Sequence, residues 1–272
     1  MTHDPSLRRI GLLAGAGDIP VYFARKASAE GIKLVSIAFS DEIASHLAPY
    51  AEKIYSIGVG QAGKIYKTLR KENITEIMIM GKVEKNLIFK LQMFDLKAIK
   101  FLSRLKTKED KVLMVNVIRV LEEDGFRVLN QREYVREIFP GKGVLTQRKP
   151  SKREMEDVEF GFPIARKMAD MEIGQTVVVK NKTVVAVEAI EGTDQALERG
   201  CVLARTKAIA IKVSRTNQDY RYDSPGIGPD TVRILAASGA SVLALEAERI
   251  MIVNQPQVVK MADNAGLSIV CV

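Results

Sequence analysis

The feature that most constrains the fold is a regular alternation of short apolar runs with amphipathic stretches that follow glycine. The first run is broken by Gly15-Ala16-Gly17, and apolar residues then recur at helical spacing to about Ala29. Strands that alternate with helices are typical of a mostly parallel sheet. The chain is therefore predicted to be α/β, with a Rossmann-like N-terminal sheet that has helices on both faces. The expected N-terminal strands are 9–14, 33–39, 53–58 and 75–83.

The second half of the chain predicts a separate, mixed α/β domain. Two prolines and two glycines among many charges in 131–153 indicate a linker, so we expect domains 1–134 and 135–272. A hairpin turn is expected at Lys180-Asn181-Lys182. Further helices are expected near 109–124, 152–171, 194–205, 230–238 and 256–265. Further strands are expected near 126–130, 176–181, 183–190, 208–214, 242–246, 250–253 and 267–272.

A scarcity of histidine limits the chemistry. The chain has two histidines, one in the N-terminal tail and His46, which we place on a helix surface. Histidine-rich dinuclear sites and common zinc sites are excluded. Carboxylates, lysines or backbone amides must then do the work, and carboxylates favour hard cations such as Mg²⁺. The two cysteines, Cys201 and Cys271, lie in apolar settings that predict buried thiols.

A net charge of +8 favours anionic partners. No nucleic-acid motif is present and aromatic residues are few, so we expect no nucleic-acid partner. Residues 85–106 predict a basic amphipathic helix. It is either a solvated helix with one buried face or a surface that meets acidic lipid headgroups.

Three glycine turns follow predicted N-terminal strands. They hold Gly15 to Gly17, Gly60 with Lys64, and Gly81 with Lys82. Ligands of parallel sheets bind beyond the carboxyl ends of strands, so these turns are expected to line one crevice. Backbone N–H groups of Gly15 to Gly17 would hold phosphate oxygens. The dinucleotide pattern fails because Pro20 stands where its third glycine should be.

Two segments of the second half combine acids with a helix start. Thr193 and Asp194 begin one predicted helix, either as an ordinary cap or beside an anion or metal. Asp223 precedes another, close in sequence to Lys212 and Arg221. A carboxylate among cations near a helix start is either an ordinary turn residue or part of an Mg²⁺ and diphosphate site.

Five segments, in order, resemble a known family. They are "LLAGAGDIP", "GVGQAGK", "MGKV", "VEAIEGTD" and "QDYRYDSPGIGPDT", and the last is the most specific. The chain resembles the LpxI type of UDP-2,3-diacylglucosamine diphosphatase of lipid A biosynthesis over essentially its whole length. Two departures are Ala16 in a turn that usually has three glycines, and Thr216 where the family often has proline.

The resemblance implies an Mg²⁺-dependent hydrolase that converts UDP-2,3-diacylglucosamine to 2,3-diacylglucosamine 1-phosphate (lipid X) and UMP. It implies two domains with the substrate between them, Asp223 as the catalytic residue, and attack on the sugar-side phosphorus. We expect Asp223 to position either the Mg²⁺ ion, as its ligand, or the attacking water. The expected substrate contacts are Gly15, Ala16, Gly17, Ile19, Gly60, Lys64, Gly81, Lys82, Gly192, Thr193, Asp194, Lys212, Gln218 and Arg221.

The resemblance and the charge together predict a cytoplasmic protein peripherally bound to the acidic inner membrane surface. The sequence is compatible with either a homodimer or a monomer. The alternative function is a non-catalytic module that binds a nucleotide-sugar or lipid. A nicotinamide-dependent oxidoreductase is a weaker alternative, because it depends on the first glycine turn alone.

Overall fold

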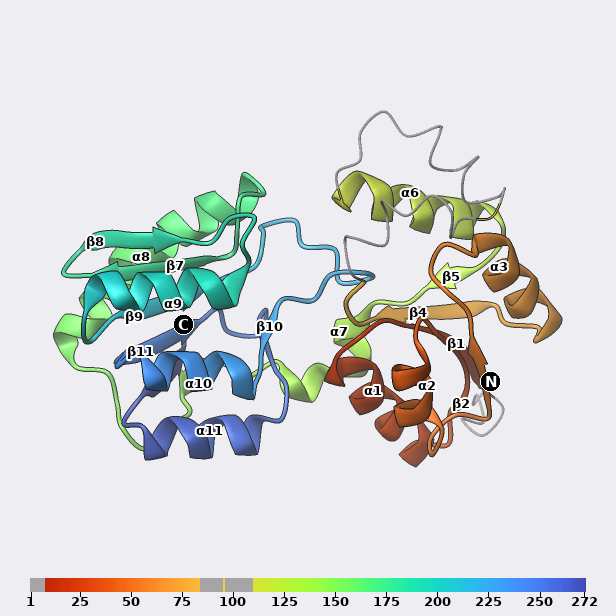
Figure 1. Cartoon of the computed structure of the whole chain (residues 1–272), viewed down its shortest axis with the longest axis horizontal. Helices are drawn as coiled ribbons and strands as arrows, with labels where there is room; N and C mark the ends of the chain where they lie inside the picture. The colour runs from red at the N-terminus through yellow and green to blue at the C-terminus, as the bar shows by residue number, and fades with distance from the viewer. Residues whose placement is uncertain (1–7, 84–94, 96–109) are drawn as a thin grey trace. The chain divides into compact units, whose positions relative to one another are not determined.

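The computed structural model describes residues 8–83, 95 and 110–272. Apart from Asp95, the expected basic helix over 85–106 lies outside the described residues. The chain forms two compact units, which Figure 1 shows by residue number. Unit 1 is Met1–Tyr134 with Tyr220–Asp223, and unit 2 is Val135–Asp219 with Ser224–Val272. The chain thus leaves unit 2 for four residues and returns, a detail that the contiguous division predicted from the sequence does not include.

Unit 1 has the predicted alternation of strands and helices. Its strands are β1 (Arg9–Ala14), β2 (Lys33–Ala38), β3 (Lys53–Ser56), β4 (Glu76–Met80) and β5 (Arg127–Val128). Its described helices are α1 (Asp18–Ala29), α2 (Asp41–Leu47), α3 (Ala62–Lys71), α6 (Asp110–Glu123) and α7 (Gln131–Tyr134). His46 is exposed on α2, which confirms its expected place on a helix surface.

The sheet of unit 1 confirms the Rossmann-like prediction. Its described strands are all parallel in the order β3-β2-β1-β4-β5. Leu13 and Ile37 of one face pack in an apolar cluster with Leu69 of α3 and Ile118 of α6. Helices α1 and α2 lie on the other side (Figure 1). Because the strand order reverses between β1 and β4, the loops that follow them meet at the switch point of the sheet.

Unit 2 is mixed, as expected. Its strands are β6 (Gly143–Val144), β7 (Thr176–Lys180), β8 (Thr183–Val187), β9 (Ile209–Lys212), β10 (Gly226–Ile227), β11 (Val242–Leu245), β12 (Met251–Ile252) and β13 (Ser268–Cys271). Its helices are η3 (Arg136–Ile138), α8 (Lys152–Asp170), α9 (Thr193–Ala204), α10 (Pro229–Ala237) and α11 (Gln255–Asn264). Elements η3 and β6 lie within the stretch that the sequence assigned to a linker.

The main sheet of unit 2 has the order β6-β13-β11-β9-β7-β8, with β9, β11 and β13 parallel and the other pairings antiparallel. Helices α9, α10 and α11 pack on one face and α8 on the other (Figure 1). Cys201 and Cys271 are buried in the first of these layers as free thiols, as predicted, and burial raises the pKa of each to about 11.

The hairpin between β7 and β8 turns where the sequence predicted it. Asn181 and Lys182 both have positive φ, 49° and 54°. Their N–H groups donate to the two carboxylate oxygens of Asp157 on α8, at 2.9 and 2.7 Å. This pair of bonds fastens the tip of the hairpin to the helix that covers the sheet.

Several strands end earlier than the sequence predicted, among them β4, which ends at Met80 rather than 83, and three strands that bear on the site. β8 ends at Val187 rather than 190, β5 ends at Val128, and β9 ends at Lys212. After β5, the side chain of Asn130 accepts the N–H of Arg132 at 3.0 Å and turns the chain into α7. Among the described residues, no helix has the length and apolarity needed to cross a membrane.

Candidate functional site

The glycine turns after β1 and β4 lie side by side, and their backbones form hydrogen bonds with each other. The N–H of Gly15 donates to the carbonyl of Met80 at 2.8 Å, and that of Ala16 to the carbonyl of Lys82 at 2.8 Å. The N–H of Lys82 donates back to the carbonyl of Ala16 at 2.9 Å. The N–H groups of Gly15 and Ala16, which were expected to hold phosphate oxygens, thus donate within the protein in this structure.

The close approach of these two turns explains their glycines. A Cβ at Gly15 would lie 2.4 Å from the carbonyl oxygen of Lys82, and one at Gly81 would lie 2.6 Å from the carbonyl oxygen of Gly15. Gly17 precedes α1 with φ +102° and has open space around it. Ile19 is only 8% exposed, so its side chain belongs to the core of unit 1.

The turn into α3 also contains an anion supplied by the protein. The carboxylate of Asp95 accepts the N–H of Gly63 at 2.6 Å, and the N–H of Asp95 donates to the carbonyl of Gly60 at 3.0 Å. A carboxylate at a helix N-terminus interacts favourably with the helix dipole. Lys64 is exposed on the same turn of the helix. Asp95 is 32 residues from Gly63 in sequence, so no local pattern could have predicted this contact.

Unit 2 gathers several expected site residues around a buried lysine. Lys212 is the last residue of β9 and is 5% exposed. Its ammonium donates to the hydroxyl of Thr193 at 2.8 Å and to that of Thr176 at 3.3 Å. It also lies 3.8 Å from the carboxylate of Glu188. A buried ammonium needs such partners, because an unpaired charge inside a protein is costly.

Glu188 completes this cluster and was missed from the sequence. Its carboxylate accepts the hydroxyl of Thr193 at 2.8 Å and the N–H of Gln175 at 3.3 Å. We refer to Lys212, Thr193, Thr176 and Glu188 as the lysine cluster. Glu188 follows β8 directly, and the sequence prediction extended that strand through it, so its inward position was not foreseen.

Other expected residues of unit 2 lie at the edge of the lysine cluster. The side-chain oxygen of Gln218 accepts the N–H of Arg215 at 3.2 Å and the side-chain N–H of Gln175 at 3.3 Å. Gly192 precedes α9 with φ +84°, and Asp194 is exposed in the first turn of that helix. Glu191 pairs instead with Arg199 at 2.6 Å.

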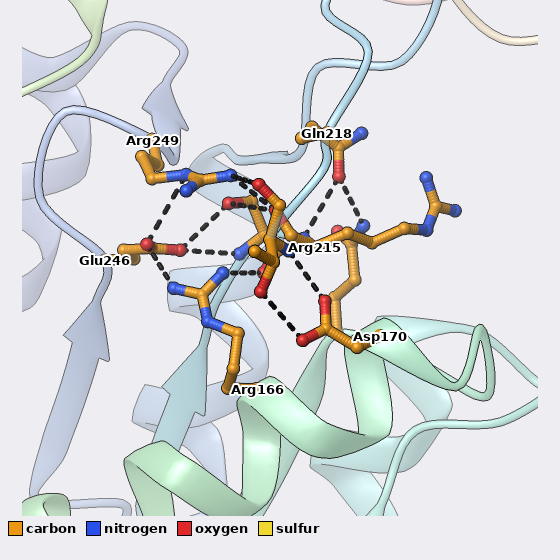
Figure 2. Close-up of polar contacts among 9 residues, drawn as sticks. Arg166, Asp170, Arg215, Gln218, Glu246 and Arg249 are labelled. Carbon is orange, nitrogen blue, oxygen red and sulfur yellow. Dashed lines mark hydrogen bonds and ion pairs between the residues drawn. The ribbon is translucent and has the colours of Figure 1, made fainter.

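The loop that follows β9 is held by the buried carboxylate of Glu246, the residue after the neighbouring strand β11 (Figure 2). Glu246, 8% exposed, accepts the N–H and the hydroxyl of Ser214, both at 2.9 Å. Figure 2 shows Glu246 between two guanidinium groups, those of Arg166 and Arg249, and both contact it. The same arginines donate to backbone carbonyls of the loop, from Arg166 to Ser214 and from Arg249 to Arg215.

Asp170 holds the next residue of this loop from helix α8 (Figure 2). It accepts the N–H of Thr216 at 2.6 Å and the hydroxyl of Thr216 at 2.8 Å. The N–H of Thr216 is the main reason that the pKa of Asp170 lies below its ordinary value. The loop that leads from Lys212 toward Asp223 is therefore fixed at several successive residues.

Asp223 itself ends the short segment that belongs to unit 1. The carbonyl of Tyr220 accepts the N–H of Gln131 at 2.9 Å. Arg221 pairs with Glu122 of α6 at 3.0 Å, and Tyr222 packs against the apolar cluster that α3 and α6 cover. The alternating aromatic and charged side chains of this stretch thus make contacts within unit 1.

The described residues contain no group of three or more histidine, cysteine, aspartate or glutamate side chains placed to hold a metal ion. The expected divalent cation would be held by the carboxylate of Asp223 together with other oxygen ligands. Mg²⁺ is commonly held by one or two carboxylates together with substrate phosphates and water. The carboxylate of Asp223 together with a diphosphate substrate fits that ligand set.

These features define a two-unit α/β protein with polar residues beyond the carboxyl ends of its parallel strands. The family models named LpxI N-terminal domain and LpxI C-terminal domain match residues 9–138 and 141–270. The chain therefore belongs to the LpxI family, as its sequence motifs indicated.

A curated relative supports the same assignment. A protein of Caulobacter vibrioides named UDP-2,3-diacylglucosamine pyrophosphatase LpxI is 30% identical, and the match covers 96% of both chains.

Solved structures resemble the chain only weakly. The biotin carboxylase domain of the Hydrogenobacter thermophilus 2-oxoglutarate carboxylase is 17% identical with a TM-score of 0.26, and covers 64% of this chain and 35% of that one. A Staphylococcus aureus N5-carboxyaminoimidazole synthetase is 11% identical with a TM-score of 0.27, over 75% of this chain and 46% of that one. The chain thus spans less than half of these structures.

Proposed function

We propose that the protein hydrolyses the diphosphate bond of UDP-2,3-diacylglucosamine, with lipid X and UMP as products. The observation that carries this proposal is membership of the LpxI family over nearly the whole chain, together with the name of the Caulobacter relative. The contacts of the described residues support the proposal, because the buried ammonium of Lys212 and the hydroxyls of Thr176 and Thr193 lie near the start of α9. Such groups suit the oxygens of a diphosphate.

The lysine cluster is the part of unit 2 that we assign to the substrate. Lys212 offers a positive charge, and Thr193 is the first residue of α9, where backbone N–H groups favour an anion. Glu188 and Thr176 keep the ammonium of Lys212 in place before the substrate arrives. A fixed cation loses little freedom on binding, so it stabilises a phosphate better than a mobile surface lysine.

Asp223 is the residue that we assign to catalysis, and it either orients the attacking water or holds Mg²⁺. When bound there, Mg²⁺ would supply positive charge to the diphosphate oxygens. The carboxylate of Asp223 would hold the cation or accept a hydrogen bond from the water. We further propose that water attacks the sugar-side phosphorus and that UMP leaves.

We propose that the protein works in the cytoplasm on the acidic face of the inner membrane, where a diacylated substrate resides. The net charge of +8 supports this partner, because basic residues are attracted to anionic lipid headgroups. We expect binding to vesicles that contain anionic lipid, and this binding should weaken as salt rises.

The test of the function is release of UMP and lipid X from UDP-2,3-diacylglucosamine in the presence of Mg²⁺. The wild type is compared with Asp223→Ala and Asp223→Asn, and Asp124→Asn, in the turn after α6, is the control. We expect the Asp223 variants to lose at least about 100-fold in rate, as expected for loss of a catalytic group, and the control to keep its rate. Full activity of Asp223→Ala, with unchanged Mg²⁺ dependence, would refute the role of Asp223. Binding of the substrate without turnover by the wild type would favour the non-catalytic alternative.

A further inference from the structure

The segment Tyr220–Asp223 is anchored to unit 1 at successive residues, although unit 2 flanks it on both sides. The backbone of Tyr220 is bound by Gln131, and its ring lies 5.6 Å below the guanidinium of Arg132. Tyr222 packs in the apolar cluster of unit 1. Between the two tyrosines, Arg221 reaches Glu122 near the end of α6.

The geometry points to Glu122 as a positioning residue for Asp223, a role that rests on the proposed function. Arg221 is only two residues before Asp223, so the ion pair of Arg221 with Glu122 restrains the backbone that carries the carboxylate. Arg221, which the sequence placed among the substrate contacts, acts here through Glu122. The cation fixes the catalytic segment to helix α6.

The exposure of this pair predicts a catalytic effect larger than its effect on stability. The side chains of Arg221 and Glu122 are 34% and 44% exposed. Exposed ion pairs contribute little to the free energy of unfolding. A misplacement of about 1 Å can nevertheless cost about 100-fold in rate. Loss of the pair should therefore lower kcat while the folded protein stays nearly as stable.

Helix α6 offers a matched control at the adjacent position. Glu123 pairs with Arg119 on the same helix at 2.5 Å and is likewise exposed. We expect Glu122→Gln to lower kcat about fivefold with KM changed less than about twofold, and Glu123→Gln to leave both unchanged. A structural defect in Glu122→Gln would instead reduce the amount of active enzyme and lower the melting temperature of that variant relative to Glu123→Gln.

Charge reversal separates positioning from substrate binding. Glu122→Arg and Arg221→Glu should each lower kcat about tenfold, because each places like charges together. The double variant restores the pair and should recover to within about threefold of the wild type. If Arg221 contacts the substrate instead, the double variant stays as inactive as Arg221→Glu, and the inference is overturned.

A second measurement does not depend on turnover. Amide hydrogen exchange of a peptide that covers 220–223 should speed up at least about threefold in Glu122→Gln and stay unchanged in Glu123→Gln. Equal exchange in the two variants would overturn the inference, even if the wild type proved inactive on UDP-2,3-diacylglucosamine. Faster exchange without wild-type turnover would keep Glu122 as the anchor of this segment and refute the proposed function.

Discussion

Replacement of Lys212 separates what the lysine cluster does for stability from what it does for the substrate. Lys212→Met removes a cation whose side chain is 6% exposed and leaves the carboxylate of Glu188, 14% exposed, without this counter-charge. Loss of one partner of a buried ion pair typically costs about 3 kcal/mol or more. We therefore expect the free energy of unfolding to fall by about 3 kcal/mol, which corresponds to a melting temperature lower by about 6–12 °C.

The double variant Lys212→Met with Glu188→Gln tests that reasoning. It removes both charges, so it should recover most of the lost stability in urea titrations, to within about 1 kcal/mol of the wild type. Its rate of UMP release should stay at least about 100-fold below the wild type, because the cation that binds the diphosphate is still missing. Restored activity in this neutral variant would refute the assignment of Lys212 to the substrate. Wild-type stability of Lys212→Met would refute the account of the ion pair.

Two further predictions concern unit 1. Gly81→Ala places a Cβ 2.6 Å from the carbonyl oxygen of Gly15 at φ +89°. Urea titrations should therefore show that its free energy of unfolding falls by about 3 kcal/mol. The control Gly125→Ala, at φ +83° with open space around it, should lose only about 1 kcal/mol. Hydrogen bonds from Lys53 and Tyr55 lower the pKa of Glu72 to about 2. Its contribution to stability is complete above its ordinary pKa and is lost as the pH falls toward 2, so Glu72→Gln should flatten the loss of stability over that acid range.

Local patterns predicted most of the strands and helices correctly, because each depends on short-range periodicity. The parallel sheet of unit 1 follows from apolar runs that alternate with glycine-led helices, and the hairpin at Asn181 and Lys182 follows from its turn residues. The positions of the glycine turns after β1 and β4 at one edge of the sheet also follow from this alternation.

Contacts between residues distant in sequence could not be predicted in the same way. Asp95 meets Gly63 across 32 residues, and Arg221 meets Glu122 across 99. The glycine turn at Gly15 suggested exposed N–H groups for phosphate, but the lack of a Cβ at Gly15 and at Gly81 lets two backbones approach closely. In each case the role of the side chain or amide depends on a tertiary contact, which a local sequence pattern does not predict.

The measurement that tests the central claim most directly is hydrolysis of UDP-2,3-diacylglucosamine in ¹⁸O-labelled water, with both products analysed by mass spectrometry. We predict equal amounts of UMP and lipid X, with the solvent oxygen on the phosphate of lipid X and none on UMP. Label on UMP would contradict attack on the sugar-side phosphorus. Absence of both products, with Mg²⁺ present and the substrate shown to bind, would contradict the claim that this chain is a diphosphatase.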